Sequence, residues 1–203
     1  MHQPERHDFE CSPSVEKLEV LLTYVRDANY IGFIKQYNGG YYYAESLQLY
    51  SVSNDGLLDD IFAINSMIAS TYKVIFRQLF SFGQDTFGNQ FCFNAVGSIV
   101  FFNIETGEIE PLADSFLSWE KALISDLDYL TGVNLRNKYV TNNGGELKYS
   151  DRLCPKVPFV MGGKYEIDNL YPLSLNDCLL VNYNIAKQVH DLPDGTPVIL
   201  NTD

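Results

Sequence analysis

Four short apolar segments in the middle of the chain are separated by turns that contain glycine. The segments span residues 79–82, 89–94, 98–104 and 108–112, and the turns carry Gly83, Gly88, Gly97 and Gly107. Short apolar runs at this spacing, bounded by glycine turns, predict an antiparallel meander of strands. Within a chain of 203 residues, the length of about one domain, the flanking segments are left to cover that sheet.

Helical periodicity lies on both sides of the meander. Ser12 and Pro13 predict the start of an amphipathic helix, because serine caps helices and proline is tolerated at the first helical position. A second helix is predicted over residues 30–37, where an Asn-Gly-Gly sequence ends it. Further helices are predicted over residues 57–70 and from about residue 115 to near 132.

Weaker patterns occupy the remaining segments. Residues 41–43 and 47–52 are strand candidates, because they are rich in Tyr, Leu and Val. Residues 183–190 predict a short helix and residues 198–200 a last strand, within a C-terminal third that is less regular than the rest.

The order of these elements predicts the fold class. Helices, then strands, then helices are typical of an α+β fold, with N-terminal helices, a central antiparallel or mixed sheet of about four to six strands, and flanking C-terminal helices. We expect an α+β core over residues 1–131 and a C-terminal extension over residues 132–203 that packs on it as a single compact unit.

Motifs that carry catalysis or bind metals are missing from the sequence. There is no H-E-x-x-H, no G-x-S-x-G and no P-loop, and none of the four cysteines forms a C-x-x-C pair. We therefore expect no enzyme, no catalytic residue, no metal site and no cofactor. The cysteines are expected to be reduced thiols in a cytoplasmic protein, with Cys92 as a small buried apolar residue. The first residues lack the apolar run of a signal peptide, and no segment is long and apolar enough to cross a membrane.

The net charge of −12 is concentrated in two segments. Residues 45–60 contain four acidic residues and no Lys or Arg, and residues 101–128 contain seven acidic residues against one lysine. Residues 132–164, in contrast, carry six basic residues and two acidic ones. This balance argues against nucleic acid as a partner, because phosphate binding needs clustered Lys and Arg.

Three interpretations of the acidic segments are open. The carboxylates can cap helices and face solvent, they can pair with the basic segment inside the fold, or they can form a surface that attracts a basic partner. Tyr42 and Tyr43 allow a similar choice, because a strand tyrosine can fill the core or anchor an interface.

The order of the motifs resembles the SUKH superfamily of bacterial immunity proteins over about residues 12–130. Residues 12–16 resemble the opening of the family's first helix, and Tyr30, Phe33 and the Asn-Gly-Gly at 38–40 resemble its next helix end. Residues 82–93 look like the family's glycine-turn hairpin, and residues 99–107 with 112–119 look like its last strands and the following helix. Residues 152–192 are similar to C-terminal segments of some type VI secretion immunity proteins.

The resemblance implies a protein without catalytic residues that binds and neutralises a cognate secreted toxin by occluding its active site. Family partners include nucleases and deaminases, so the partner would be a basic toxin domain, with no nucleic acid and no membrane involved. Eukaryotic relatives act in cell-wall regulation, which leaves a non-enzymatic regulatory scaffold or peptide-binding module as the alternative. The oligomeric state is not readable from the sequence. The expected partner contacts are Asp55, Asp59, Asp60, Glu105, Glu108, Glu110, Asp114, Tyr42 and Tyr43.

Overall fold

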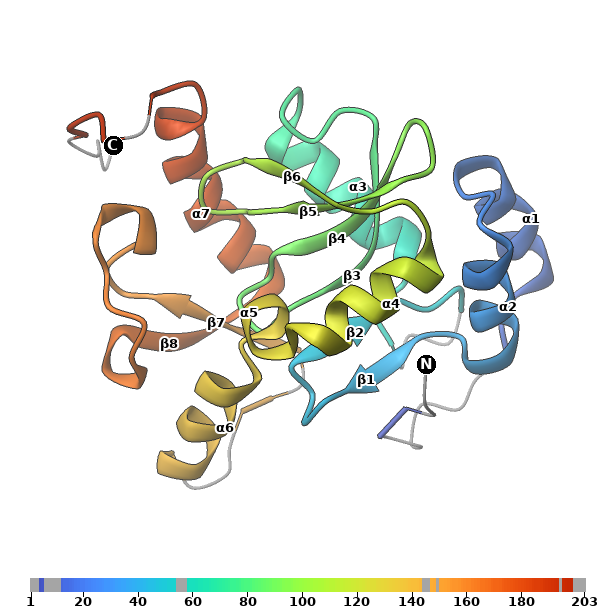
Figure 1. Ribbon diagram of the computed structural model, residues 1–203, viewed down its shortest axis with the longest axis horizontal. Coiled ribbons are helices and arrows are strands. Elements are labelled where there is room, and N and C mark those ends of the chain that lie inside the picture. Colours follow the sequence, from blue (N-terminus) through green and yellow to red (C-terminus); the bar gives the residue numbers. More distant parts are fainter. Residues whose placement is uncertain are drawn as a thin grey trace.

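The computed structural model describes residues 4–5, 12–53, 58–143, 147–148, 150–193 and 195–198. Within these ranges the chain forms an α+β fold around a six-stranded antiparallel sheet (Figure 1). No helix in the described ranges has both the length and the apolar character needed to span a membrane. The expected fold class is confirmed.

The sheet follows the chain order from one edge to the other. Its strands are β1 (Gly40–Tyr42), β2 (Leu47–Leu49), β3 (Leu79–Gln84), β4 (Gln90–Asn94), β5 (Ile99–Phe102) and β6 (Ile109–Ala113). Every neighbouring pair is antiparallel, so the meander predicted from the glycine turns is confirmed and extends to two earlier strands. The backbone N–H of Glu5 donates to Tyr41 at the β1 edge, whereas the first three residues of β6 are exposed at the other edge.

An aromatic cluster fills the space between one sheet face and two helices, α2 (Ala28–Tyr37) and α4 (Phe116–Ser125). Trp119 of α4 is fully buried and packs edge-on against Phe82 and Phe91 of the sheet. Tyr30 of α2 contacts the same cluster through Phe82. The apolar stripes of both helices therefore serve the core, as helical periodicity predicts.

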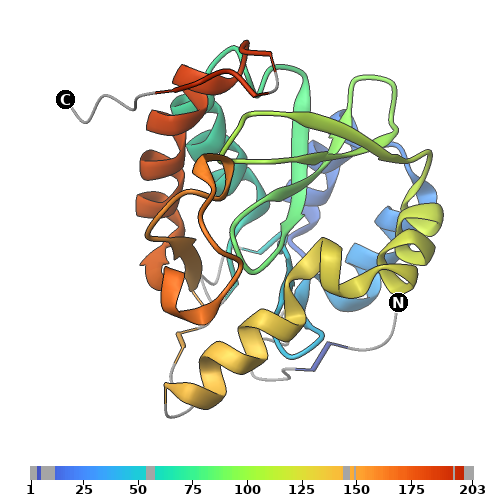
Figure 2. The same ribbon diagram turned by 60° about the vertical axis from the view of Figure 1, so that its left-hand side comes forward.

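The opposite face is covered by α3 (Ile61–Tyr72) and α7 (Leu175–Val189), which lie side by side in Figures 1 and 2. Tyr72 of α3 packs edge-on against Phe102 of β5 and Tyr183 of α7, and its hydroxyl donates to the carbonyl of Ile104 at 2.6 Å. Helix α1 (Val15–Tyr24) packs beside this layer through Tyr24, which stacks on Phe80.

Capping side chains explain where several helices begin. Asp27, Asp60 and Ser115 occupy the N-cap positions of α2, α3 and α4, and each side chain accepts hydrogen bonds from backbone N–H groups of the first turn. The second carboxylate oxygen of Asp27 also accepts from the N–H of Phe116 at 2.9 Å, so one residue fixes the starts of two neighbouring helices.

The C-terminal third is more regular than the sequence suggested. The helix expected to run to residue 132 breaks at Asp126 into α4 and α5 (Leu127–Thr131), and α6 (Val133–Asn142) follows after Gly132, whose positive φ turns the chain. A hairpin of β7 (Asp151–Pro155) and β8 (Leu170–Ser174) encloses two short 3-10 turns, η1 (Phe159–Met161) and η2 (Ile167–Asn169). The two hairpin strands and the two 3-10 turns were not predicted from the sequence, because each is short and lies near proline or glycine residues.

Helix α7 begins at Leu175, eight residues before the predicted start at Tyr183. Ser174 caps it, and the buried residues repeat at helical spacing through Leu175, Cys178 and Leu179. Val198 is not in a strand, and the other two residues of the strand expected at 198–200 lie outside the described ranges.

The expectation of four reduced thiols is wrong in this structure. Cys154 of β7 and Cys178 of α7 form a disulfide in the buried interior, between two elements that were not predicted to be adjacent. Cys92 is fully buried with a free thiol, as expected, and burial raises the pKa of that thiol.

Candidate functional site

Two hollows flank the turn that joins β5 to β6, residues 103–108, hereafter the β5–β6 turn. Asn103 shapes this turn, because its side-chain oxygen accepts from the N–H groups of Glu105 and Thr106 at 2.9 and 3.2 Å. Gly107 completes the turn with a φ of +75°, a conformation that glycine adopts without strain. Thr106 lines both hollows, so the turn separates them.

The larger hollow, hereafter the acidic cavity, has a volume of about 670 Å³. It lies between the β5–β6 turn, the α4–α5 junction and the C-terminal extension. Its walls include rings of Phe87, Phe159 and Tyr165, whose centroids are 5.7 Å apart in each pair. The extension therefore contributes two of these three rings, and the sheet core alone would leave the cavity open.

Two carboxyl groups lie in the depth of the acidic cavity. Asp85 is 3% exposed, and burial raises the pKa of its carboxyl to about 7, although hydrogen bonds from Asn89 and Phe87 act in the opposite direction. Glu105 is 7% exposed, and burial likewise raises the pKa of its carboxyl, which accepts the N–H of Val160 in η1. Backbone donors therefore position both groups.

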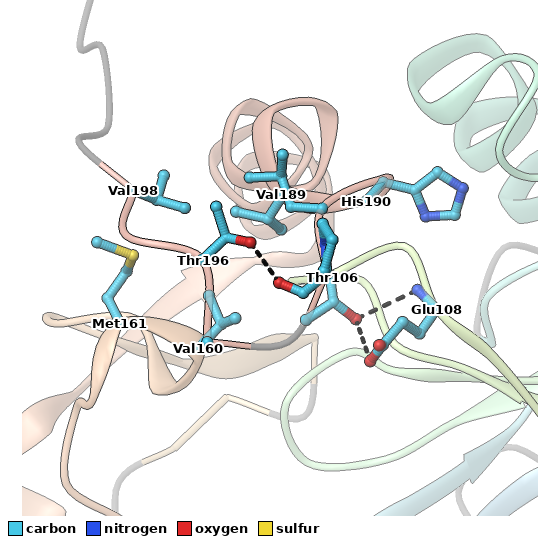
Figure 3. A pocket seen from close by; sticks show the side chains of 11 residues that line it. Thr106, Glu108, Val160, Met161, Val189, His190, Thr196 and Val198 are labelled. Carbon is cyan, nitrogen blue, oxygen red and sulfur yellow. Dashed lines mark hydrogen bonds between the residues drawn. The ribbon is translucent and has the colours of Figure 1, made fainter.

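The smaller hollow has a volume of about 300 Å³ and lies on the other side of the β5–β6 turn (Figure 3). Thr106 and Glu108 form one wall, where the Thr106 hydroxyl donates to the Glu108 carboxylate at 3.1 Å. Val189 at the end of α7 and Met161 at the end of η1 supply apolar sides. The His190 side chain points away from the hollow in Figure 3, and its Nδ1 atom lies close to Gly107.

The first acidic segment is largely paired within the fold. Glu45 accepts a hydrogen bond from Arg136 of α6 at 2.7 Å, and Asp60 forms an ion pair with Lys17 of α1 at 2.7 Å while it caps α3. Asp59 accepts from the buried side chain of Gln48 at 2.8 Å.

Arg152 extends this internal pairing. Its guanidinium donates to the same Gln48 side chain that bonds Asp59. Basic residues of the C-terminal extension thus meet the first acidic segment inside the molecule, which was one of the three interpretations of the charge pattern. Asp55 lies outside the described residues.

The two candidate tyrosines lie at the β1 end of the sheet. Tyr42 is 3% exposed and packs against Phe33 of α2, so its side chain offers almost no surface to a partner in this conformation. Tyr43 is half-buried beside Tyr42 and begins a turn of three residues with positive φ. Arg136 holds this turn by donating to the carbonyl of Ala44.

The second acidic segment presents its exposed carboxylates along β6. Glu108, Glu110 and Asp114 are exposed, and within the described residues no Lys, Arg or His lies within ion-pair distance of them. Glu110 stands opposite Phe101 on the outermost strand of the sheet. We call these three residues the β6 acidic edge. It is distinct from Glu105, which is buried behind η1.

Sequence reasoning did not single out Asp85, Asp128 or the aromatic wall of the cavity. The glycine turn at 83–88 was recognised, but nothing in the sequence indicates that Phe159 and Tyr165 return to it. Only the β7–β8 hairpin brings them back, and that hairpin was not predicted. Among the described residues, no three His, Cys, Asp or Glu side chains are grouped so that they could hold a metal ion.

Among solved structures, the fold is similar to that in the crystal structure of Atu4351 from Agrobacterium tumefaciens. The two share 13% sequence identity with a TM-score of 0.60, over 89% of this chain and 84% of that chain. At this identity the likeness shows a shared fold alone. A search among curated proteins gives no significant match.

The sequence also matches a protein-family model. The model of the SMI1 / KNR4 family (SUKH-1) covers residues 15–121, from the start of α1 into α4. Residues 152–192 lie outside this match, so their similarity to type VI secretion immunity proteins stays a prediction. Because the match covers more than half of the 203 residues, the chain belongs to the SMI1 / KNR4 (SUKH-1) family.

Proposed function

We propose that the protein is an immunity protein of the cytoplasm that binds a cognate secreted bacterial toxin and neutralises it by occluding its active site. Membership of the SUKH-1 family is the observation that carries this proposal, because the superfamily that the sequence resembles consists largely of immunity proteins. The absence of a recognisable catalytic motif in the sequence is consistent with a binding role.

The β6 acidic edge is the part of the surface best suited to the contact. Among the residues that the structure describes, no cation pairs with its three carboxylates, in contrast to Glu45 and Asp60. A toxin that acts on nucleic acid carries a positive substrate groove, because it must bind phosphates. An acidic surface attracts such a groove, accelerates association and covers the site where the substrate would lie.

The nine residues expected from the sequence contribute differently to this proposal. Glu108, Glu110 and Asp114 are proposed as direct contacts. Asp59, Asp60 and Glu105 already have partners within the fold, so we assign them to shaping the surface rather than to contacting the toxin. Tyr42 is proposed to support Tyr43, whose half-buried ring is available at the opposite sheet edge.

The direct test uses the product of the gene next to this one in its native genome. Expression of that product alone is expected to stop growth, and co-expression with this chain is expected to restore it. Purified components should form a complex that abolishes the toxin's activity. Growth arrest that this chain fails to relieve, or a neighbouring product that it does not bind, would contradict the proposal.

A charge-reversal pair tests the contact surface. Glu108→Lys with Glu110→Lys is expected to lower the association rate at low salt by about tenfold or more and to reduce its salt dependence, because long-range attraction is lost. The matched control is Glu16→Lys with Glu19→Lys on exposed positions of α1, which makes the same change in net charge. Equal association rates for both double variants would exclude the β6 acidic edge.

A regulatory scaffold or peptide-binding module is the second candidate function. The acidic cavity favours it, since a pocket lined by rings and carboxyl groups suits a peptide side chain. A gene without a toxic neighbour, together with binding of a basic peptide by the isolated protein, would support this candidate.

A further inference from the structure

The lining of the acidic cavity carries charge of one sign. Four acidic residues line it, Asp85, Glu105, Asp126 and Asp128, and no described Lys, Arg or His does, although Arg152 lies near enough to Asp85 to lower its pKa. Charges of one sign within walls of low dielectric constant produce a focused potential. The cavity is therefore favourable for a cation and unfavourable for a phosphate or carboxylate.

Aromatic rings make up much of the remaining wall. Phe87, Phe101 and Phe159 are half-buried in the lining, while Tyr129 and Tyr165 are exposed at 69% and 51%. Aromatic faces attract organic cations, and arginine stacks on them more often than lysine does. A volume of about 670 Å³ exceeds what one side chain fills, so a side chain with its flanking backbone can enter.

Asn182 of α7 adds a buried polar group that is not fully used. Its side chain is 3% exposed and lines the cavity, and its Nδ2 atom donates to the carbonyl of Cys178 at 2.8 Å. The Oδ1 atom accepts no hydrogen bond from any described residue. Because this oxygen is not fully enclosed by protein, it can accept a hydrogen bond from an N–H group of a ligand in the cavity.

We propose that the acidic cavity binds the side chain of an arginine within a basic segment of the partner protein. A guanidinium presents five N–H donors in one plane, which suits several carboxyl and amide oxygens around a cavity better than the point charge of an ammonium group. Its apolar stem and planar face would lie against the aromatic wall. This inference rests on the proposed function, because it specifies the chemistry of the partner.

The test uses the full-length protein and a synthetic probe. The tripeptide acetyl-Gly-Arg-Gly-amide is titrated into 15N-labelled protein and followed by the amide resonances. Shifts are expected at residues 85–89, 103–106, 126–129 and 159–165, which surround the cavity. The same peptide with citrulline in place of arginine keeps the shape and removes the charge, and we expect it to bind at least about tenfold more weakly.

Two pairs of isosteric variants locate the binding. Asp126→Asn with Asp128→Asn removes two charges from the cavity rim, while the amide oxygen of residue 128 can still accept the N–H of Asn134 as the Asp128 carboxylate does. This pair should weaken binding of the arginine peptide by about tenfold or more. Glu108→Gln with Glu110→Gln makes the same charge change outside the cavity lining and should leave the affinity within about twofold.

The outcomes separate this inference from the proposed function. Three results would each overturn the cavity proposal even if a toxin binds. They are equal affinity for the arginine and citrulline peptides, amide resonance shifts confined to β6, and unchanged affinity of the Asp126/Asp128 double variant for the arginine peptide. Specific binding of the arginine peptide in the cavity, without any toxin neutralised by this chain, would support the cavity and refute the immunity function.

Discussion

Replacing Asp60 by alanine tests whether this acidic residue is structural. Its Oδ1 atom accepts the N–H groups of Phe62 and Ala63 at 3.1 and 3.0 Å at the start of α3. Its Oδ2 atom forms the 2.7 Å ion pair with Lys17, which joins α1 to α3. Removal of the carboxylate therefore breaks a cap and an inter-helix contact at once.

The expected loss can be worked from these two contacts. Loss of an aspartate N-cap costs about 1 kcal/mol of unfolding free energy. The side chains of Lys17 and Asp60 are 28% and 21% exposed, so the pair is partly screened by solvent and contributes about 0.5–1 kcal/mol. We expect Asp60→Ala to lower the free energy of unfolding by about 1.5–2 kcal/mol.

Urea unfolding provides the assay, because the single tryptophan, Trp119, is fully buried and reports loss of the core by fluorescence. Asp60→Asn keeps a capping oxygen and should lose only the ion-pair part. A double-mutant cycle with Lys17→Met should give a coupling of about 0.5–1 kcal/mol. A loss below about 0.5 kcal/mol in Asp60→Ala, or zero coupling, would refute the assignment of Asp60 to the fold.

Three further substitutions test the site and its surroundings. Burial raises the pKa of the Asp85 carboxyl from its ordinary value of 3.8 to about 7, so the folded state binds this proton more strongly than the unfolded state does. The unfolding free energy should therefore fall as pH rises from about 4 to 7, and Asp85→Asn should flatten that slope in urea titrations at several pH values. Gly107→Ala should lower stability in thermal unfolding by about 1 kcal/mol more than Gly97→Ala does. Both glycines have a positive φ, but only at position 107 would an added Cβ meet side-chain atoms at 3.0 Å. Equal losses of stability in the two variants would show that the packing around Gly107 is loose. Arg136→Met should leave the Glu45 carboxylate and the adjoining turn without their donor and lower the free energy of unfolding by about 2 kcal/mol. Arg136→Lys should not fully restore this stability. An unchanged urea-unfolding curve for Arg136→Met would contradict this role of Arg136.

Local signals were sufficient for the core of the fold. The glycine turns between residues 79 and 112 predicted the meander, and the Asn38 position that ends α2 has the left-handed backbone expected of such a stop. These features depend on neighbours within a few residues, so sequence patterns report them well. The same reasoning failed at β7 and β8, where Pro155 and Pro172 interrupt the patterns, and at the first half of α7, whose burial comes from distant contacts.

The candidate site divides in the same way. The exposed acidic residues of β6 were identified from the charge of one segment, and they remain exposed because β6 is the outermost strand of the sheet. Glu105 and Tyr42 were named as contacts for equally good local reasons, yet η1 covers Glu105 and α2 covers Tyr42. A sequence does not show which surface a later segment will cover.

The sequence by itself determined the family, the antiparallel centre and the uneven distribution of charge. The tertiary structure decided which of those charges remain available. Arg136 reaches Glu45 across 91 residues and Arg152 reaches Gln48 across 104, so two cations of the extension are used within the fold. Electrostatic pairing depends on distance in space, and residues so far apart in the chain become neighbours only after the extension has packed on the sheet. Among the described residues, the β6 acidic edge and the acidic residues of the cavity beside it remain without a paired cation.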